Sequence, residues 1–479
     1  MPAVTDIKKT AITLREKIAY GLGDVGNNFL FDLGQIYLLK FFTDSLGLPP
    51  AVAGYVFLFT KILDAITDVM VGTWIDRRRR YGRFGKFRTV MIFAVVPLAV
   101  CTAVSFYRPD FALNGKIIWA YFSYALFGTV YTFFNIPYGS MIPAMTKDPV
   151  ERATMASFRE AGAKIGLLVT LIAFLPLVGL SAKWFGEKYS FFAAAGVFAI
   201  AGCFMQLTCA LNIRERYVEP SKPKAVKPKA ELAISGKSAE EGFFSAILKS
   251  YRAVFKNNPL LILSLVNLFT FSAFNVKLAI LAYYCQYVLN DISLVPYAGL
   301  FQGTCLLLGV FLVRPLVRRY GKKSTYIMGA AIWAVADFTA LFVVNDIISF
   351  GIFAGIAFFG SAFTNTLNWA LIADAVEYGE WKTGTRSEGV VYSFFTFFRK
   401  LSQAVAGFVP GIVLAWVGYQ ANAVQTQTAI DGIKGLVFVY PGAMAVLTFL
   451  IMTFCYKLTD KRYREIVAEL KEKKKENND

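Results

Sequence analysis

Long apolar runs recur along this chain and constrain its fold more than any other feature. A helix that crosses the roughly 30 Å hydrocarbon core of a bilayer needs about 20 apolar residues. Twelve segments meet this requirement, and they lie near residues 18–44, 51–74, 89–107, 117–142, 158–180, 190–212, 259–289, 294–316, 324–345, 349–376, 390–418 and 435–456. The first begins within Arg15-Glu16-Lys17 and has no small-residue cleavage site, so we do not interpret it as a removable signal. The sequence predicts an all-α membrane protein with twelve transmembrane helices.

The composition argues against soluble and catalytic classes. Only 17% of the 479 residues are charged and 56% are hydrophobic, whereas soluble domains carry about 25% charged residues. There is no histidine, which excludes His-based triads, His-ligated zinc and His proton relays. The six cysteines stand in apolar stretches without CxxC spacing, so we interpret them as small core residues. We expect neither an enzyme nor a cofactor.

The net charge of +18 follows the predicted topology. Most lysines and arginines outside the spans stand in the N-terminal tail, the even-numbered connections and the C-terminal tail, and few stand in the odd-numbered connections. This asymmetry is typical of the positive-inside rule and predicts that both termini are cytoplasmic. We therefore expect anionic lipid headgroups, and no nucleic acid, beside these basic residues.

A polar Lys-, Pro- and Ala-rich segment divides the chain into two halves. We predict an N-terminal six-helix bundle, a cytoplasmic linker, a C-terminal six-helix bundle and a cytoplasmic tail, at residues 1–212, 213–258, 259–456 and 457–479. A short basic turn with glycine follows the second helix of each half, at residues 76–86 and 318–323. Such a repeat indicates a duplicated six-helix unit, and two such bundles around a central cavity favour an alternating-access transporter.

Charged residues inside the second apolar run suggest a cation site. Asp64 and Asp68 are spaced i and i+4, so their carboxylates share one helix face, with Lys61 one turn before. Two carboxylates one turn apart can bind a small cation or share a proton. A structural ion-pair network is the alternative. Thr396 and Lys400 have the same spacing in a later run, and we expect Lys400 either to approach the two acids when no cation is bound or only to neutralise a buried acid.

Polar and aromatic residues on two further helices suggest a sugar site. Asn28, Asp32 and Gln35 are predicted to share one face of the first helix, and Tyr131, Asn135 and Tyr138 one face of the fourth. Amides and aromatic rings suit sugar hydroxyls and the apolar face of a sugar ring, although aromatic stripes in membrane helices also serve packing.

Two cations in apolar runs have no evident partner in the sequence. Lys277 stands in the middle of the seventh run and Arg159 near the start of the fifth. Facing a cavity, they would favour an anionic substrate. The alternative for Lys277 is that its side chain extends to the membrane interface.

Several motifs together identify a family. They are Tyr20-Gly-Leu-Gly-Asp-Val-Gly-Asn-Asn28, Asp64-Ala-Ile-Thr-Asp68, Gly85-Lys-Phe-Arg88, Asn135-Ile-Pro-Tyr-Gly139, Asp374-Ala-Val-Glu-Tyr-Gly-Glu-Trp381 with Ser387-Glu-Gly389, and Arg399-Lys400. With them the chain resembles, over essentially its whole length, the glycoside–pentoside–hexuronide:cation symporter family, the melibiose permease branch of the major facilitator superfamily. The resemblance implies a major facilitator fold, import of a sugar derivative coupled to Na⁺ or H⁺, a bacterial inner membrane location and a functional monomer.

The resemblance also implies roles for individual residues. The predicted cation-binding set is Asp64, Asp68, Thr132 and Lys400, with Asp64 and Asp68 as ligands if the cation is Na⁺. The predicted substrate-binding set is Asn28, Asp32, Tyr131, Asn135, Arg159, Lys277, Asn365, Trp369 and Thr396. Melibiose permease has aspartates where Asn28 and Asn135 stand here and an aromatic residue where Gly139 stands. The neutral amides remove two negative charges, which would suit an anionic sugar.

Within the family, the chain resembles most the sulfoquinovose importer branch. The resemblance lies in residues 14–17, 32–40, 273–280 and 368–371, although that branch lacks an acid at the position of Asp64. Sulfoquinovose is a glucose with an anionic sulfonate at C6, and Lys277 and Arg159 would give it charge-assisted hydrogen bonds. A hexuronide such as glucuronide makes nearly the same electrostatic demand and remains an alternative. Efflux of a sugar phosphate or a lipid is an alternative of another class.

Overall fold

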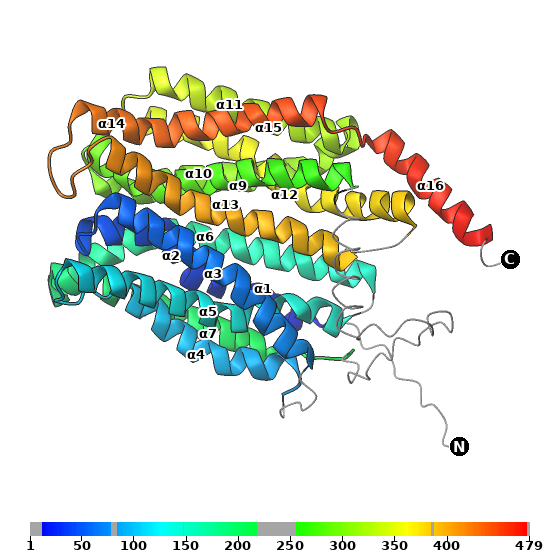
Figure 1. Ribbon diagram of the computed structural model, residues 1–479, viewed down its shortest axis with the longest axis horizontal. Helices are drawn as coiled ribbons and strands as arrows, with labels where there is room; N and C mark the ends of the chain where they lie inside the picture. Colours follow the sequence, from blue (N-terminus) through cyan, green and yellow to red (C-terminus); the bar gives the residue numbers. More distant parts are fainter. Residues whose placement is uncertain are drawn as a thin grey trace, which may run out of the picture.

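The computed structural model describes residues 12–77, 84–146, 148–217, 255, 257–384 and 388–476. Within these ranges the chain is helical and contains no strand, as predicted. The long helices run side by side along one direction (Figure 1). This arrangement suits a bilayer, because a helix satisfies its backbone hydrogen bonds within its own segment.

Each half of the chain contributes a set of long helices. The N-terminal half contains α1 (Leu14–Asn27), η1 (Asn28–Asp32), α2 (Leu33–Lys40), η2 (Phe41–Ser45), α3 (Pro50–Arg77), α4 (Phe87–Ser105), α5 (Leu113–Met145), α6 (Pro149–Phe185) and α7 (Glu187–Asn212). The C-terminal half contains α9 (Asn258–Tyr283), η3 (Tyr284–Val288), η4 (Ile292–Leu294), α10 (Val295–Tyr320), α11 (Lys322–Val343), α12 (Ile347–Thr383), α13 (Glu388–Trp416), α14 (Gln427–Lys434), η5 (Gly435–Val439), α15 (Tyr440–Phe454) and α16 (Asp460–Glu476). The elements η1 and η5 are single π-helical turns within longer helices, whereas η2 and η3 are π-helical turns at the C-terminal ends of theirs.

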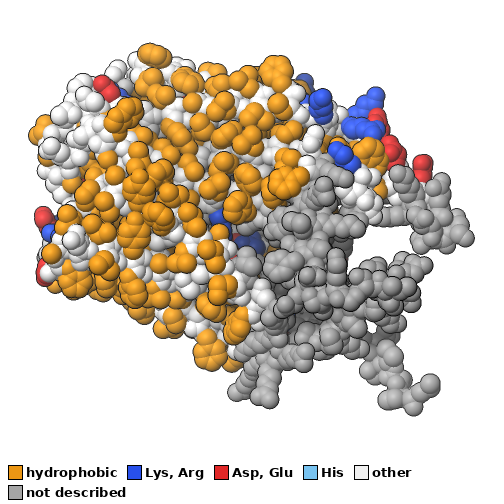
Figure 2. All heavy atoms as spheres, viewed as in Figure 1, with side chains coloured by type: hydrophobic (Ala, Val, Ile, Leu, Met, Phe, Trp, Pro, Cys, Tyr) orange, Lys and Arg blue, Asp and Glu red, His pale blue; other side chains and the backbone are white. Residues whose placement is uncertain are grey.

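The helices have the length and the surface of membrane spans. Ten segments of the described chain are long and apolar enough to cross a membrane. The continuous helical run 14–45 and α3 also have the required length, which is consistent with the twelve predicted spans. Hydrophobic side chains cover most of the visible face, and charged side chains gather toward its two ends (Figure 2). A surface this apolar is stable only against lipid.

Helices within each half pack mainly on one another, and the two halves meet along three pairs of helices. These pairs are α3 with α13, α6 with α10, and α2 with α9. The first two pairs join the second helix of one half to the fifth of the other, and the third pair joins the first helices of both halves. The space between the halves is therefore lined by helices from both. The predicted linker falls almost entirely on residues 218–254 and 256, which lie outside the described residues, as do residues 78–83 of the first basic turn and Ser387.

The two basic turns are built in the same way. Gly85 (φ +109°) precedes α4 and Gly321 (φ +83°) precedes α11. The Glu215 carboxylate accepts the first three backbone N–H groups after Gly85, each at 2.8 Å. The Asp460 carboxylate accepts the N–H of Lys322 at 2.8 Å. In both halves an acid that follows the last long helix thus neutralises the positive N-terminal end of the third, and an added Cβ on either glycine would overlap that acid.

The predicted tail is partly a helix. Its first turn carries Asp460, which caps α11, and Ile466 is fully buried. Trp381 Nε1 of α12 donates to Glu469 Oε2 at 2.6 Å. These contacts explain why this part of the charge-rich predicted tail folds as α16 and packs against the C-terminal half.

A cluster of polar contacts joins the halves at the end opposite the basic turns. We call it the closing cluster, and it consists of Lys40, Thr43, Asp44, Tyr283, Tyr287 and Tyr419. The hydroxyls of Thr43 and Tyr283 are 2.7 Å apart. Asp44 accepts from Tyr287 (3.0 Å) and Tyr419 (2.6 Å) and pairs with Lys40 at 2.7 Å. The cluster therefore closes the space between the halves at this end.

Candidate functional site

The two predicted acids of α3 lie at the junction of the two halves. Asp68 Oδ1 accepts a hydrogen bond of 2.8 Å from Thr132 Oγ1 of α5. The other oxygen of Asp68 forms an ion pair with Lys400 of α13, whose Nζ lies 3.4 Å from the backbone oxygen of Asp64. The predicted approach of Lys400 to these acids is therefore present. Asp68 and Lys400 remain 25% and 21% exposed, so water or an ion can reach them.

Asp64 retains an oxygen that the described protein leaves without a partner. Its Oδ2 pairs with Lys61 at 3.1 Å, whereas its Oδ1 is buried and has no hydrogen-bond partner among the described residues. The Lys61 ammonium lies over the rings of Phe31 (4.5 Å) and Tyr124 (5.3 Å), which hold it on one side of the carboxylate. The carboxylate packs directly against Gly128, where any Cβ would overlap Oδ1. An unpaired buried acceptor is costly, and a cation would satisfy it.

The geometry makes a cation and Lys400 alternatives. Asp64 Oδ1, Asp68 and Thr132 Oγ1 offer hard oxygen donors of the kind that small cations prefer. The Lys400 ammonium occupies the accessible oxygen of Asp68. A cation bound between the two carboxylates would weaken that ion pair, because two positive charges would then share the same acid. Since α3 and α13 belong to different halves, cation binding would change a contact that joins the halves.

The predicted polar face of the first helix is interrupted. Asn28 and Asp32 are separated by the π-helical turn η1, in which the extra residue rotates the side chains that follow. Asn28 is buried, and its Nδ2 donates to the backbone oxygen of Asp24 at 3.0 Å. Gln35 is buried and its Nε2 donates to the Tyr124 hydroxyl at 2.7 Å. Of the three, only Asp32 is partly exposed. Asn28 and Gln35 are buried in this structure, and their contact with a sugar stays a prediction.

Tyr131 and Asn135 lie one turn apart on α5, as predicted, and both are partly exposed. Tyr138, the third residue of the predicted face, is fully buried, and its hydroxyl donates to the backbone oxygen of Tyr20 at 2.6 Å. The Tyr131 ring stacks on Phe31, with centroids 4.2 Å apart. Phe31 also lies under the Lys61 ammonium, so the candidate sugar-facing ring and the candidate cation site share a residue. This contact gives the two sites a direct physical connection.

The two cations expected to be unpaired both have acidic partners. Arg159 Nε donates to Asp24 Oδ2 at 2.7 Å, and its Nη2 is 3.4 Å from Oδ1. Lys277 forms a buried ion pair with Asp337 of α11, and both side chains are at most 2% exposed. Charges in the membrane interior must be compensated, and the compensating acids stand far away in the sequence. The expectation of two free cations at the substrate site is therefore wrong.

The remaining predicted residues of the C-terminal half lie on α12 and α13. Trp369 is 43% exposed, and Asn365, one turn before it, is partly exposed. Thr396 is exposed one turn before Lys400. All three are thus accessible, in contrast to Lys277.

A cation that the sequence did not single out lies beside Trp369. The Arg399 guanidinium lies 4.5 Å from the ring centroid of Phe271 and 5.4 Å from that of Trp369. Among the described residues it forms no ion pair or hydrogen bond. The acids Glu160 and Asp32 of the other half act on it electrostatically. The signal for it in the sequence is its position directly before Lys400, within an apolar run.

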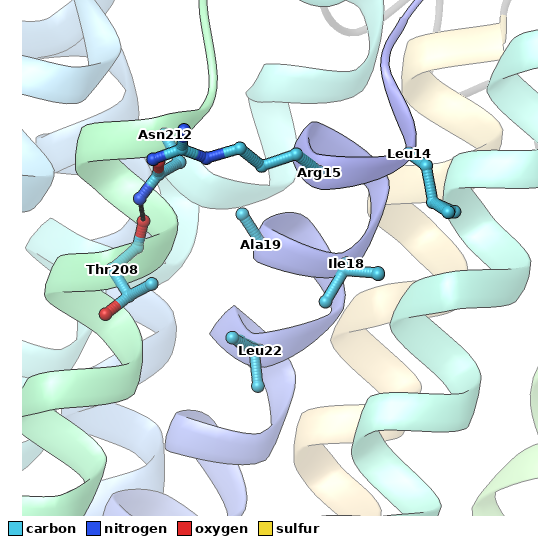
Figure 3. Close-up of a pocket in the computed structure, with 7 residues that line it drawn as sticks. All are labelled: Leu14, Arg15, Ile18, Ala19, Leu22, Thr208 and Asn212. Carbon is cyan, nitrogen blue, oxygen red and sulfur yellow. Dashed lines mark hydrogen bonds between the residues drawn. The ribbon is translucent and has the colours of Figure 1, made fainter.

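One apolar groove lies away from these residues. It has a volume of about 470 Å³ and runs between α1 and α7. Figure 3 shows Leu14, Ile18 and Leu22 along one side and Thr208 and Asn212 along the other, with the Arg15 side chain reaching toward Asn212. None of the predicted site residues lines it, so we do not assign it to the substrate.

Comparison with known proteins identifies the family. Residues 19–460 match the family described as MFS/sugar transport protein. The chain is 44% identical, over 97% of both chains, to a Salmonella typhimurium protein named as a candidate 2,3-dihydroxypropane-1-sulfonate exporter. It is 43% identical, over 97% of this chain and 95% of the relative, to an Escherichia coli protein named as a candidate sulfoquinovose importer. An Escherichia coli glucuronide carrier protein homolog is 34% identical over 97% of both chains.

Solved structures support the same fold. A D-xylose–proton symporter aligns with a TM-score of 0.64 and 14% identity, over 92% of this chain and 98% of that chain. A bacterial homolog of the human lysosomal transporter Spinster aligns with a TM-score of 0.62 and 14% identity, over 95% and 97%. The chain therefore belongs to the glycoside–pentoside–hexuronide group of the MFS/sugar transport family, whose members are multi-pass membrane transporters of sugar-like substrates rather than enzymes.

Proposed function

We propose that this protein imports a sulfonated sugar such as sulfoquinovose together with a Na⁺ or H⁺ ion, by alternating access. The observation that carries the proposal is the junction of α3 and α13. There Asp64 keeps an unpartnered buried oxygen and Asp68 pairs with Lys400 of the other half. The sulfoquinovose importers named among the relatives support the choice of sugar.

The cycle follows from competition at Asp68. A cation that binds Asp64, Asp68 and Thr132 displaces the Lys400 ammonium and loosens the contact between α3 and α13. The sugar then binds beside Tyr131 and Trp369, and the loaded halves reorient. Thermodynamic linkage requires that the sugar strengthens cation binding by the same factor by which the cation strengthens sugar binding.

The proposed topology places both termini in the cytoplasm of a bacterium, with the protein in its inner membrane. The basic residues near the turns at Gly85 and Gly321 support this orientation through the positive-inside rule. The closing cluster then seals the outer side, so the site exchanges ligand with the cytoplasm in this state. One chain supplies both halves of the site, so we propose that a monomer transports.

Uptake into proteoliposomes tests the proposed function. The purified full-length protein is reconstituted, and uptake of labelled sulfoquinovose is measured with an inward Na⁺ gradient, an inward H⁺ gradient or neither. We expect one gradient to drive accumulation above equilibrium, and Asp68→Asn to remove that accumulation. Equal uptake with and without either gradient would contradict cation coupling.

Export of a small organosulfonate is the second candidate function. It is favoured by the relatives named for 2,3-dihydroxypropane-1-sulfonate, which are as similar as the sulfoquinovose importers. The same proteoliposomes separate the two. Import predicts gradient-driven accumulation of sulfoquinovose, whereas export predicts that 2,3-dihydroxypropane-1-sulfonate is the preferred substrate and that a cation gradient drives it out of loaded vesicles. A preference for glucuronide over both would instead favour a hexuronide carrier.

A further inference from the structure

We propose that Arg399 is the anion-binding residue of the substrate site and that its guanidinium receives the sulfonate of the substrate. The inference rests on the proposed function only in taking a sulfonate as the ligand. It does not depend on the direction of transport or on the coupling ion.

The other basic residues near the site already have acidic partners. Lys61 pairs with Asp64, Lys400 with Asp68, Arg159 with Asp24, and Lys164 with Glu160 at 3.1 Å. Lys277 pairs with Asp337 deeper in the C-terminal half. An anionic substrate that bound one of these would have to break an ion pair and leave an acid uncompensated. Arg399 is the basic residue of this group without an ion pair among the described residues, and it can bind an anion without that cost.

The surroundings of Arg399 hold the guanidinium while leaving its donors available. The rings of Phe271 on α9 and Trp369 on α12 lie within 4.5 and 5.4 Å of it. Trp369 is in turn supported by Phe395, at 5.5 Å between centroids. A guanidinium interacts with aromatic rings through its flat face, whereas its N–H groups point outward in its own plane. The described residues take none of these N–H groups, and the side chain is partly exposed.

This geometry matches the chemistry of a sulfonate. A sulfonate presents three equivalent oxygens, and a planar guanidinium can donate two parallel hydrogen bonds to two of them. The exposed Trp369 ring beside the guanidinium offers an apolar surface for the sugar ring. A carboxylate of a uronic acid presents two oxygens in one plane and could accept the same two parallel hydrogen bonds.

The groups that face Arg399 across the junction suit the other end of a sugar. Asp32 of η1 is partly exposed and has no hydrogen-bond partner among the described residues. A carboxylate accepts hydrogen bonds and cannot donate them, so it repels a sulfonate but accepts sugar hydroxyls. Glu160 is already bound to Lys164. A sulfonated sugar would therefore place its sulfonate on Arg399 of one half and its hydroxyls on Asp32 of the other.

Binding measurements on the full-length protein test this assignment. Affinities for sulfoquinovose, 2,3-dihydroxypropane-1-sulfonate and uncharged methyl α-glucoside are measured by calorimetry in detergent. We expect Arg399→Gln to lower the affinity for both sulfonates by roughly 30-fold, the equivalent of a lost charge-assisted bidentate contact. The affinity for the glucoside should change by no more than about two-fold. Arg399→Lys keeps the positive charge but cannot donate two parallel hydrogen bonds, so we expect an intermediate loss of sulfonate affinity. Arg319→Gln, which changes an exposed arginine on α10, is the matched control and should alter none of the three.

The outcomes separate this inference from the proposed function. Unchanged sulfonate affinity in Arg399→Gln, an equal loss for the glucoside, or a wild type that binds the glucoside and no sulfonate would each overturn the role of Arg399. If Arg399→Gln does not fold, an unchanged sulfonate affinity in Arg399→Lys would contradict the bidentate contact. Sulfonate binding that depends on Arg399, without gradient-driven uptake, would support the role of Arg399 in anion binding and refute symport. Gradient-driven uptake with an unchanged KM for sulfoquinovose in Arg399→Gln would support symport and refute the role of Arg399.

Discussion

Replacing Asp68 by asparagine removes one negative charge from the proposed cation site without changing the size of the side chain. The amide oxygen can still accept the hydrogen bond from Thr132. A cation bound to Asp68 would lie within about 4 Å of its charge, where two unit charges attract by about 4 kcal/mol at an effective dielectric constant of about 20. The cation affinity should therefore fall by about three orders of magnitude.

The same substitution should leave the protein folded. Asp68 and Lys400 are both about a quarter exposed, so Lys400 can be hydrated when its partner is neutral. The cost to folding is then about 1 kcal/mol, as for an exposed ion pair, rather than the larger cost for a buried one. A loss of function in Asp68→Asn would consequently report on the site and not on unfolding.

The assay compares sugar affinity with and without the cation, by calorimetry on the purified protein. Wild type should bind the sugar more tightly when Na⁺ or H⁺ is present, whereas Asp68→Asn should bind it equally in both conditions. Thr132→Val should lower the affinity for the cation about ten-fold, as expected for the loss of one neutral ligand. Thr129→Val is its control, because that hydroxyl bonds only to the backbone of its own helix. Full cation stimulation in Asp68→Asn would refute the assignment of the site.

Three further substitutions test the framework around the site. Gly321→Ala forces a side chain into a turn with φ +83° and against Asp460, so we expect a loss of about 2 kcal/mol, seen as a lower Tm in detergent. Tyr419→Phe removes a 2.6 Å hydrogen bond to Asp44, worth about 1 kcal/mol, so spin-label distances across the closing cluster should show a larger open population. Lys277→Gln should leave the Asp337 carboxylate uncompensated and lower the free energy of unfolding by about 3 kcal/mol or more. Binding of charged and uncharged sugars should fall equally, and adding Asp337→Asn should restore stability.

Each of these has a control and a contrary result. Gly196→Ala lies in a helix with open space around it and should not lower Tm, so equal effects at both glycines would contradict the cap. Tyr297→Phe changes a tyrosine that is 61% exposed and should leave the spin-label distances unchanged, and an equal shift there would contradict the closing cluster. If Lys277→Gln weakened only the anionic sugar and remained stable, Lys277 would contact the substrate after all.

The features that the sequence predicted are those with local causes. Apolar runs of membrane length define the spans because lipid tolerates few other segments. The spacing of Asp64 and Asp68 places both acids on one face of any straight helix. The repeated basic turns at Gly85 and Gly321 carry their own conformational signature, and the structure gives both a positive φ and an acidic cap.

The features that the sequence did not predict depend on distant partners. Nothing near Arg159 or Lys277 in the chain reveals that Asp24 or Asp337 will lie beside it. The turn from Asn28 to Asp32 is π-helical, and a regular helical wheel does not include the extra residue of such a turn. Arg399 became a candidate only when the structure showed which other cations are already paired.

The charged side chains around the two proposed sites cancel one another. They are Asp24, Asp32, Asp64, Asp68 and Glu160 against Lys61, Arg159, Lys164, Arg399 and Lys400. One sulfonate and one monovalent cation add no net charge to this set, whereas a cation with an uncharged sugar would add a positive charge inside the membrane. Because an uncompensated charge there is costly, the neutral pair should be the combination that reorients.

This balance predicts that transport of the sulfonated sugar is electroneutral. With one cation per sulfonate, a membrane potential set by potassium and valinomycin should not change the rate of sulfoquinovose uptake into proteoliposomes, and sulfoquinovose should evoke no transport current on a supported membrane. Any uptake of methyl α-glucoside should instead carry one positive charge and accelerate when the vesicle interior is negative. An inward positive current with sulfoquinovose would mean that more than one cation accompanies each sugar, which two carboxylates and one hydroxyl of a single site could not explain.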